Sequence, residues 1–263
     1  MFISIIITIK NEAKTIQPLL DSLLDQQQPF EIIIIDANSS DDTQKIIKKY
    51  MQNHSNIKLY IKAGSRGNGR NYGVTKAKGE IVAFTDGGCT AEKNWLENIR
   101  KKMSEGYDIV AGKTINTGSF KETKRVEIIQ NGYDITWPSC NLAYKKQLFE
   151  KINGFDEQFI TAEDIDLNFK AVKTGAKIGY AEKAIIYRSS ASSLYKFIQQ
   201  SFWYGYGRKQ LSLKHGTIWK NYSANQMMQT QLTLHGVLRL VFGFFGYISC
   251  KNQKNLKITN SIK

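Results

Sequence analysis

Strand-like and helix-like patterns alternate along the first 90 residues, and this alternation limits the possible folds more than any other feature. Apolar runs at residues 2–9, 31–35, 57–61 and 81–86 are short and rich in β-branched side chains, which is typical of strands buried on both faces. Helix-like segments separate them, the first with apolar residues at helical spacing: Ile16, Leu19, Leu20, Leu23 and Leu24. Strands that alternate with helices pair in parallel through right-handed crossovers. The sequence therefore predicts an α/β domain with a mostly parallel central sheet flanked by helices.

Length and cysteine content indicate the general class of protein. A chain of 263 residues can form one substantial core, so we expect one domain with an appendage. Its three cysteines, Cys89, Cys140 and Cys250, are too few and too scattered for a disulfide framework or a metal cluster, which favours the reducing cytoplasm. The apolar first residues lack a basic leader and a cleavage site, so we do not expect a signal peptide.

The net charge of +14 is concentrated near the C-terminus. Residues 183–263 contain twelve Lys and Arg and no Asp or Glu, whereas the preceding residues are nearly balanced. The same region contains an apolar, aromatic run at 236–248 that is shorter than the ~20 residues needed to cross a bilayer. Arg239 within it opposes insertion by roughly 2.5–3.5 kcal/mol if central. We interpret the run as a helix lying on an anionic membrane surface.

Two other interpretations of this basic region stay open at this stage. Short apolar runs are often helices packed on the protein's own core. Basic residues interleaved with aromatics also occur in proteins that bind single-stranded nucleic acid. The segment 242–247 is too apolar for a solvated groove, however, so we expect no nucleic-acid partner.

Carboxylates follow two of the predicted strands at the point where each strand ends. Asp36 and Asp86 occupy these positions, and the carboxyl ends of parallel strands border the crevice in which such sheets bind ligands. Gly87 and Gly88 follow Asp86 and permit a ligand to approach the backbone closely. Taken alone, this stretch is also compatible with an ordinary turn at the end of a strand.

A glycine-rich basic segment at 64–71 is predicted to form a loop between these carboxylates. It contains Arg66 and Arg70, and arginine suits phosphate recognition because its planar group donates two hydrogen bonds at once. The segment is neither a Rossmann fingerprint nor a phosphate-binding P-loop. We therefore expect a nucleotide to be held by carboxylates and arginines, although such segments are often plain exposed turns.

An acidic run at 161–166 begins a predicted helix that ends at Gly175. Acidic residues in a first helical turn often only complement the helix dipole. The same dipole keeps a carboxylate ionised, as a general base requires.

Six short segments, taken in order and with their spacing, resemble a known family. They are residues 4–12, 35–39, 70–73, 84–86, 154–156 and 163–164. Together they resemble the family 2 glycosyltransferases, which have the GT-A fold, over roughly residues 3–210. The resemblance implies transfer of a sugar from a nucleotide-diphosphate sugar to an acceptor hydroxyl with inversion at the anomeric carbon.

The resemblance also implies roles for individual residues. Asp164, paired with Glu163, would be the general base that deprotonates the acceptor. Asp36 would contact the base and ribose of the nucleotide, and Asp86 would be the first aspartate of the D-x-D motif and a candidate metal ligand. Further donor-binding candidates are Thr8, Asn11, Glu12, Arg66, Arg70 and Gly87, and candidates for the acceptor or diphosphate side are Trp137, Asn141, Arg188, Trp203 and Arg208.

The chain departs from the family pattern at three positions. Gly88 replaces the second aspartate of the D-x-D motif, Arg188 follows Tyr187 where a metal-binding histidine often occurs, and Thr8 replaces a proline. A hard divalent cation prefers several oxygen ligands, so the first two changes favour activity without a metal. The alternative is that Asp86, water and the diphosphate still hold Mg²⁺ or Mn²⁺.

These features predict a GT-A domain at 1–205, with a nucleotide-sugar half at 1–115 and an acceptor half at 116–205, followed by a basic helical region at 206–263. The favoured function is an inverting glycosyltransferase acting on a lipid-linked or cell-surface glycan, peripherally attached to the cytoplasmic face of the plasma membrane. The alternatives are a non-catalytic nucleotide-sugar-binding protein on the same fold and, third, a nucleic-acid-binding protein.

Overall fold

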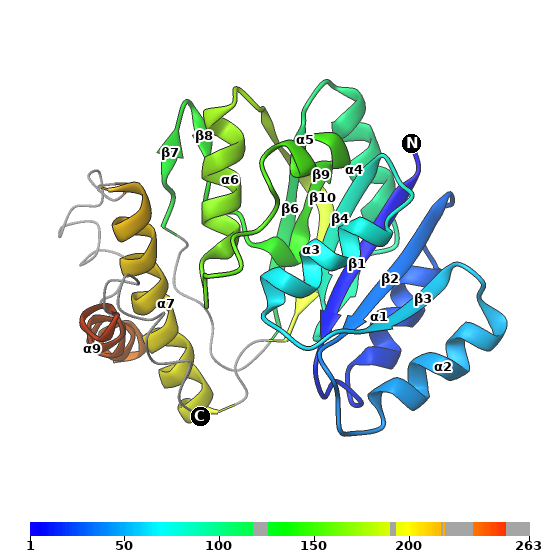
Figure 1. The fold of residues 1–263 in the computed structure, drawn as a ribbon, viewed down its shortest axis with the longest axis horizontal. Coiled ribbons are helices and arrows are strands. Elements are labelled where there is room, and N and C mark those ends of the chain that lie inside the picture. The colour runs from blue at the N-terminus through cyan, green and yellow to red at the C-terminus, as the bar shows by residue number, and fades with distance from the viewer. Residues whose placement is uncertain (118–125, 190–192, 217, 219–233, 251–263) are drawn as a thin grey trace.

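One mixed sheet forms the centre of the molecule (Figure 1). The computed structural model describes residues 1–117, 126–189, 193–216, 218 and 234–250, and within these residues eight strands pair in the order β3-β2-β1-β4-β9-β6-β10-β5. Their bounds are β1 Ile3–Ile9, β2 Phe30–Asp36, β3 Ile57–Ile61, β4 Ile81–Asp86, β5 Cys89–Ala91, β6 Ile109–Asn116, β9 Leu142–Lys145 and β10 Ile178–Arg188. A separate small hairpin consists of β7 Ile129–Gln130 and β8 Tyr133–Asp134.

The four strands predicted from the first 90 residues are confirmed, and they are mutually parallel. The pairing of β6 with β10 is also parallel, whereas β9 and β5 pair antiparallel with their neighbours. The register places Thr8 opposite Asp86 and Ile9 opposite Asp36. The ends of three central strands therefore meet at one edge of the sheet, where ligands bind in folds of this kind.

Helices cover both faces of the sheet. The apolar residues of α1 Ile16–Leu24, α2 Thr43–Asn53 and α4 Trp95–Ser104 belong to the core on one face. The core on the other face includes apolar residues of α3 Arg66–Lys76, α5 Lys146–Lys151 and α6 Glu163–Lys173. A 3-10 turn, η1 Ser139–Asn141, leads into β9. This three-layer arrangement confirms the predicted fold class.

The segment at 64–71 was predicted to be a loop, and this prediction is wrong for most of its length. Helix α3 begins at Arg66, and the side chain of Ser65 caps it by accepting a hydrogen bond from the Asn68 amide. Glycines let this helix lie very close to the sheet: a Cβ on Gly73 would lie 2.5 Å from Ile6 Cγ2, and one on Gly69 would lie 2.8 Å from Thr8 Cγ2. Tertiary packing thus outweighs the low helix propensity of glycine.

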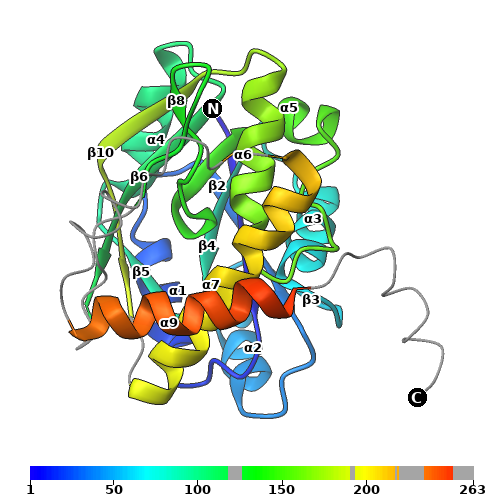
Figure 2. The ribbon, with the colours of Figure 1, turned by 90° about the vertical axis from the view of Figure 1, so that its left-hand side faces the viewer.

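Two long helices, α7 Leu194–His215 and α9 Leu234–Ser249, lie beside the sheet domain. The predicted domain boundary at 205/206 falls inside α7, which is continuous there. Figure 2 shows α9 lying across α7. Glycines permit this crossing, because a Cβ on Gly205 would lie 1.7 Å from the carbonyl oxygen of Gly243. Of the predicted C-terminal region, residues 217, 219–233 and 251–263 lie outside the described residues.

The outer face of α9 is an exposed apolar stripe. Its members follow helical spacing and are 44–62% exposed: Val237, Val241, Phe244, Phe245 and Ile248. The helix thus packs on the protein through one face, as the alternative interpretation expected, and leaves another apolar face uncovered by the described residues. Within the described part of the chain, no helix has the length and hydropathy needed to cross a bilayer.

The α7–α9 crossing can be tested with two alanine substitutions in one helix. A Cβ on Gly246 would lie 1.8 Å from the carbonyl oxygen of Phe202, whereas the nearest atom to a Cβ on Gly243 is 3.5 Å away. Both changes raise helix propensity by up to about 1 kcal/mol. We expect Gly246→Ala to lower the melting temperature and expose α9 to trypsin, and Gly243→Ala to do neither. Equal behaviour of the two variants would contradict this packing.

Candidate active site

Two cavities meet at the carboxyl edge of the sheet. The larger, of about 1520 Å³, is bordered by Glu163 and Asp164 on one side and by residues of α7 and α9 on the other. The smaller, of about 360 Å³, lies along the ends of β1, β2 and β4. Arg66, Asp86 and Arg188 line both. This junction therefore combines one carboxylate with two guanidinium groups.

Asp86, the last residue of β4, is held by a buried arginine. Arg70 Nη2 lies 2.7 Å from Asp86 Oδ1, and the Arg70 side chain is 1% exposed. Burial raises the pKa of Asp86, but the charges of Arg70, Arg188 and Arg66 outweigh this effect, so that the pKa lies below its usual value. Asp86 is therefore ionised at neutral pH.

The same arginine also holds Glu163, the first residue of α6. Arg70 Nη1 lies 2.9 Å from Glu163 Oε1, and Arg66 Nε lies 3.8 Å from the same oxygen. Burial opposes the charge on Arg70, but Asp86 and Glu163 outweigh it and raise the pKa of the guanidinium. Arg70 thus bridges Asp86 and Glu163 and also lines the larger cavity, and its predicted contact with the donor stays a prediction.

Asp164 follows Glu163 and lines the larger cavity. Its Oδ2 accepts a hydrogen bond of 3.1 Å from the Ser139 amide, and its Oδ1 accepts one of 2.9 Å from the Ile165 amide. Burial, followed by the charge of Glu163, raises the pKa of Asp164 to about 6. A half-buried carboxylate with this pKa is ionised at pH 7 and still basic enough to take a proton, as a general base must be.

Asn141 was predicted to face the acceptor, and the structure places it elsewhere. Its side chain is 1% exposed and does not line either cavity. Its Oδ1 accepts from Trp95 Nε1 at 2.8 Å, and its Nδ2 donates to the carbonyls of Lys113 and Ala184. Asn141 therefore fixes the turn that carries the Ser139 amide.

Helix α7 binds the loop that precedes α6, the helix that carries Glu163 and Asp164. Gln210 Oε1 accepts from the Ile160 amide at 3.2 Å, and its Nε2 donates to the Gln158 carbonyl at 3.1 Å. Close packing adds to this, because a Cβ on Gly207 would lie 2.6 Å from Thr161 Cγ2. The backbone just before Glu163 is thereby fixed, including Ala162 with its left-handed φ of 64°.

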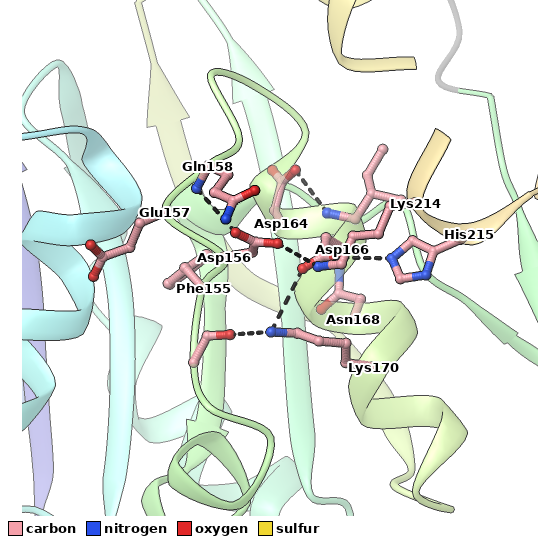
Figure 3. A network of polar contacts seen from close by, with 12 residues as sticks. Phe155, Asp156, Glu157, Gln158, Asp164, Asp166, Asn168, Lys170, Lys214 and His215 are labelled. Atoms are coloured by element: carbon pink, nitrogen blue, oxygen red, sulfur yellow. Dashed lines mark hydrogen bonds and ion pairs between the residues drawn. The ribbon is translucent and has the colours of Figure 1, made fainter. Parts of the chain in front are cut away.

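A second connection between α6 and α7 forms around Asp166 (Figure 3). Asp166 is fully buried, and its Oδ1 lies 2.6 Å from His215 Nε2 and 2.7 Å from Lys214 Nζ. Lys214 also binds Asp156 at 2.6 Å. Burial raises the pKa of Asp166, but these hydrogen bonds and charges lower it overall. The network fixes the C-terminal end of α7 against the helix that carries Asp164.

The predicted donor residues divide into those that line the smaller cavity and those that do not. Thr8, Glu12, Gly87, Arg66 and Asp86 line it. Gly87 cannot carry a side chain without clashing, because its Cβ would lie 2.7 Å from Glu12 Cγ.

Asp36 and Asn11 instead organise the loops beside this cavity. Asp36 is fully buried and accepts hydrogen bonds from Ser39 and Gln44, while its neighbours Ile35 and Ala37 line the cavity. Asn11 Oδ1 accepts from the Ser40 amide at 2.9 Å. For both residues, contact with the nucleotide stays a prediction.

The larger cavity contains the remaining predicted residues and two that the sequence did not single out. Four of the predicted residues line it, namely Trp137, Arg188, Trp203 and Arg208, and their contact with acceptor or diphosphate stays a prediction. Tyr180 also lines it, stacked on Trp137, and Tyr204 lines it from α7. Tyr180 has an outward position on a strand with irregular alternation, so no local pattern distinguishes it from a solvent-exposed residue.

A divalent cation fits the junction poorly. In the described part of the chain, no group of three or more His, Cys, Asp and Glu could hold a metal ion. Asp86 Oδ1 already binds Arg70, and Gly88, where the family has a carboxylate, has open space around its Cβ position. Since oxygen-ligated cations need several carboxylate or carbonyl ligands, these residues offer an incomplete set.

Family models and curated relatives match much of this chain. The model of the Glycosyl transferase family 2 matches residues 4–161, and that of the Glycosyl transferase family group 2 matches residues 123–250. The glycosyltransferase AglE of Haloferax volcanii is 27% identical over 201 residues, which cover 70% of this chain and 66% of AglE. The poly(ribitol-phosphate) beta-N-acetylglucosaminyltransferase TarS of Staphylococcus aureus is 30% identical over 203 residues, which cover 71% of this chain and 35% of TarS.

Solved structures share the fold. Residues 1–349 of S. aureus TarS in complex with UDP-GlcNAc match with a TM-score of 0.65 and 20% identity, over 97% of this chain and 82% of that one. The mannosyltransferase PcManGT from Pyrobaculum calidifontis, in complex with GDP-Man and Mn²⁺, matches with a TM-score of 0.66 and 16% identity, over 98% and 79%. The family match covers more than half of the described fold and includes the strands that carry Thr8, Asp36 and Asp86. The chain therefore belongs to the family 2 glycosyltransferases, as the resemblance of its sequence segments predicted.

Proposed function

We propose that this chain is an inverting glycosyltransferase that moves a sugar from a nucleotide-diphosphate sugar to a hydroxyl of a glycan or lipid-linked acceptor. The observation that carries the proposal is the position of Asp164. It is a half-buried carboxylate fixed by two backbone amides in the wall of a large cavity, and that cavity meets a smaller one at Asp86. A fixed base on one side of a junction and a binding cavity on the other suit a single displacement.

In this mechanism the smaller cavity holds the nucleotide and the larger one holds the acceptor. Asp164 takes the proton from the acceptor hydroxyl as its oxygen bonds to the anomeric carbon. The bond from that carbon to the diphosphate breaks on the opposite face, so the configuration inverts. Arg66 and Arg188, which line both cavities, would stabilise the negative charge that develops on the leaving diphosphate.

A nucleotide-release assay tests the proposal. Purified protein is incubated with a panel of UDP-, GDP- and dTDP-sugars, with and without a crude lipid and glycan extract as acceptor. We expect at least one donor to release its nucleoside diphosphate faster when the extract is present. Binding of a donor without release under any condition would instead support a non-catalytic nucleotide-sugar-binding protein.

Independence from a metal ion is part of the proposal. Gly88 stands in place of an aspartate, so few oxygen ligands surround Asp86 for a divalent cation. The positive charges of Arg66 and Arg188, which act on Asp86, would also repel such a cation. We expect activity to persist in EDTA, whereas loss of one clamping arginine should cost about 100-fold or more. Gly88→Asp, for which there is room, should raise metal affinity without restoring a complete site. Full loss in EDTA with full recovery on adding Mn²⁺ would overturn this part.

Peripheral attachment to an anionic membrane surface on its cytoplasmic side is also proposed. It is supported by the exposed stripe of α9 and by the absence of acidic residues after position 182. Apolar burial and about 1 kcal/mol per nearby Lys or Arg would act together.

Vesicle sedimentation tests the membrane proposal. We expect binding to anionic vesicles, partial release at high salt because exposed charges are screened, and weak binding to neutral vesicles. The double substitution Val241→Ser and Ile248→Ser, at stripe residues that line neither cavity, should weaken binding, whereas Met51→Ser, at an exposed apolar residue on α2, should not. Equal partitioning onto both vesicle types would count against the proposal.

A further inference from the structure

Tyr180 and Trp137 form an aromatic stack at the wall of the larger cavity. Their ring centroids lie 4.7 Å apart with an interplanar angle of 15°, and both side chains line the cavity. Tyr180 is 42% exposed, whereas the neighbouring aromatic residues Phe84, Tyr144 and Phe155 are 0–2% exposed in the core. Trp137 packs against the core, and Tyr180 lies on it outside the core, so that the pair presents an aromatic surface to the cavity.

The strand β10 fixes the direction of Tyr180. A Cβ on Gly179 would lie 2.7 Å from Tyr107, which packs with the core on the α1, α2 and α4 face. Since successive side chains of a strand point to opposite faces, Tyr180 projects to the face that carries α6 and the larger cavity. No hydrogen bond joins its hydroxyl to another of the described residues.

The stack is tied to the proposed base through one short turn. The carbonyl of Trp137 accepts a hydrogen bond of 3.1 Å from Asn168 on α6, and the Ser139 amide two residues later donates to Asp164. Polar side chains of Lys113, Glu127 and Thr136 line the same cavity. An exposed aromatic face with polar groups around it, on a turn that is hydrogen-bonded to the proposed base, is suited to an amphipathic ring.

We propose that Tyr180, backed by Trp137, is an acceptor platform on which the C–H face of a pyranose ring stacks. The partly positive C–H groups of such a ring meet the negative face of the aromatic system, while the ring hydroxyls remain free for the surrounding polar side chains. This assignment rests on the proposed function, and it commits to a cyclic sugar rather than an acyclic polyol as the acceptor unit next to the base.

Saturation-transfer NMR tests the platform directly. The probes are the methyl pyranosides of glucose, N-acetylglucosamine, mannose and galactose, with ribitol as the acyclic control. We expect at least one pyranoside to receive saturation mainly at protons of one ring face, and ribitol to receive little. Affinity for that pyranoside should fall about tenfold in Tyr180→Ala and Tyr180→Leu, on the scale of one aromatic contact. Tyr180→Phe should bind like the wild type.

Controls separate the platform from folding and from the proposed function. Tyr195→Ala removes an aromatic residue that is 73% exposed outside both cavities, and it should bind pyranosides normally. Tyr180→Leu preserves bulk, so loss of binding at an unchanged melting temperature points to the aromatic face.

Kinetic readouts complete the test. In transfer assays Tyr180→Leu should raise the KM for a pyranoside acceptor about tenfold and change the donor KM less than twofold. Two results would overturn the platform. One is an enzyme that turns over its donor while the Tyr180 variants bind pyranosides as the wild type does. The other is wild-type protein that binds none of the pyranosides. Absence of turnover with every nucleotide-sugar would instead refute the proposed function, and the NMR result would still report on the platform.

Discussion

Asp164→Asn is expected to abolish most sugar transfer while leaving donor binding intact. Asparagine has nearly the same shape as aspartate but cannot take a proton from the acceptor, and loss of a general base costs about 100-fold or more. Asp164 does not line the smaller cavity, which is proposed to hold the nucleotide, so the dissociation constant of the donor should change little. Single-turnover transfer and donor titration measure the two quantities. Asp42→Asn, at an exposed residue before α2, is the matched control and should retain full activity.

The same residue sets an expected pH dependence. Burial and the charge of Glu163 raise the pKa of Asp164 to about 6. A base acts in its ionised form, so kcat should be constant above this pH and fall as the pH drops through about 6. This fall in kcat, the acid limb of the pH profile, should be absent from the profile of the residual activity of Asp164→Asn. Transfer within a few-fold of wild type in that variant would remove Asp164 from the mechanism.

Arg70→Met is expected to damage both stability and activity. Methionine preserves much of the volume but leaves Asp86 and Glu163 without the guanidinium that binds them at 2.7 and 2.9 Å. Removing one partner of a buried ion pair costs about 3–5 kcal/mol because the remaining charge is desolvated without compensation. Urea denaturation at pH 7.5 measures the free energy of unfolding. Adding Glu163→Gln to Arg70→Met removes one of the two carboxylates that lack a partner in the single variant. The double variant should therefore recover part of the lost free energy of unfolding.

The pH dependence of activity should also reveal the charge of Arg70. Its charge lowers the pKa of both Asp86 and Asp164, so its removal should move the acid limb of the pH profile above about 6 in whatever activity remains. Arg66 is the matched control one helical turn earlier, with 54% exposure and a 3.8 Å contact to Glu163. Arg66→Met should cost less than about 1 kcal/mol of stability. A similar stability loss in both variants, with no movement of the acid limb, would contradict the bridging role.

The parallel strands of the first 90 residues could be predicted because a local apolar pattern in the sequence marks each of them. The segments Ile3–Ile9, Phe30–Asp36 and Ile81–Asp86 are mostly apolar, and a parallel sheet leaves little freedom in where their carboxyl ends lie. Asp86 and Asp164 consequently lie where the sequence placed them, at the end of a strand and at the start of a helix.

Other features depended on contacts between distant segments. Arg70 and Glu163 are 93 positions apart, so nothing local distinguishes a buried bridging arginine from one that clamps phosphate. The family resemblance likewise suggested Asn141 for the acceptor side, yet its three partners come from α4, β6 and β10. The glycines of α3 were interpreted as loop formers because the sheet that they approach is absent from any local window.

The stereochemistry of the reaction tests the central claim most directly. The claim is that Asp164 acts as a base in one displacement, and such a displacement must invert the anomeric carbon. The product formed from an active α-linked nucleotide-sugar can be followed by ¹H NMR from the start of the reaction, with the coupling constant of the anomeric proton as the readout. We predict a β-linked product in the wild type, and formation of it about 100-fold slower or more in Asp164→Asn. An α-linked product would contradict the account, because retention requires a different set of groups around the sugar.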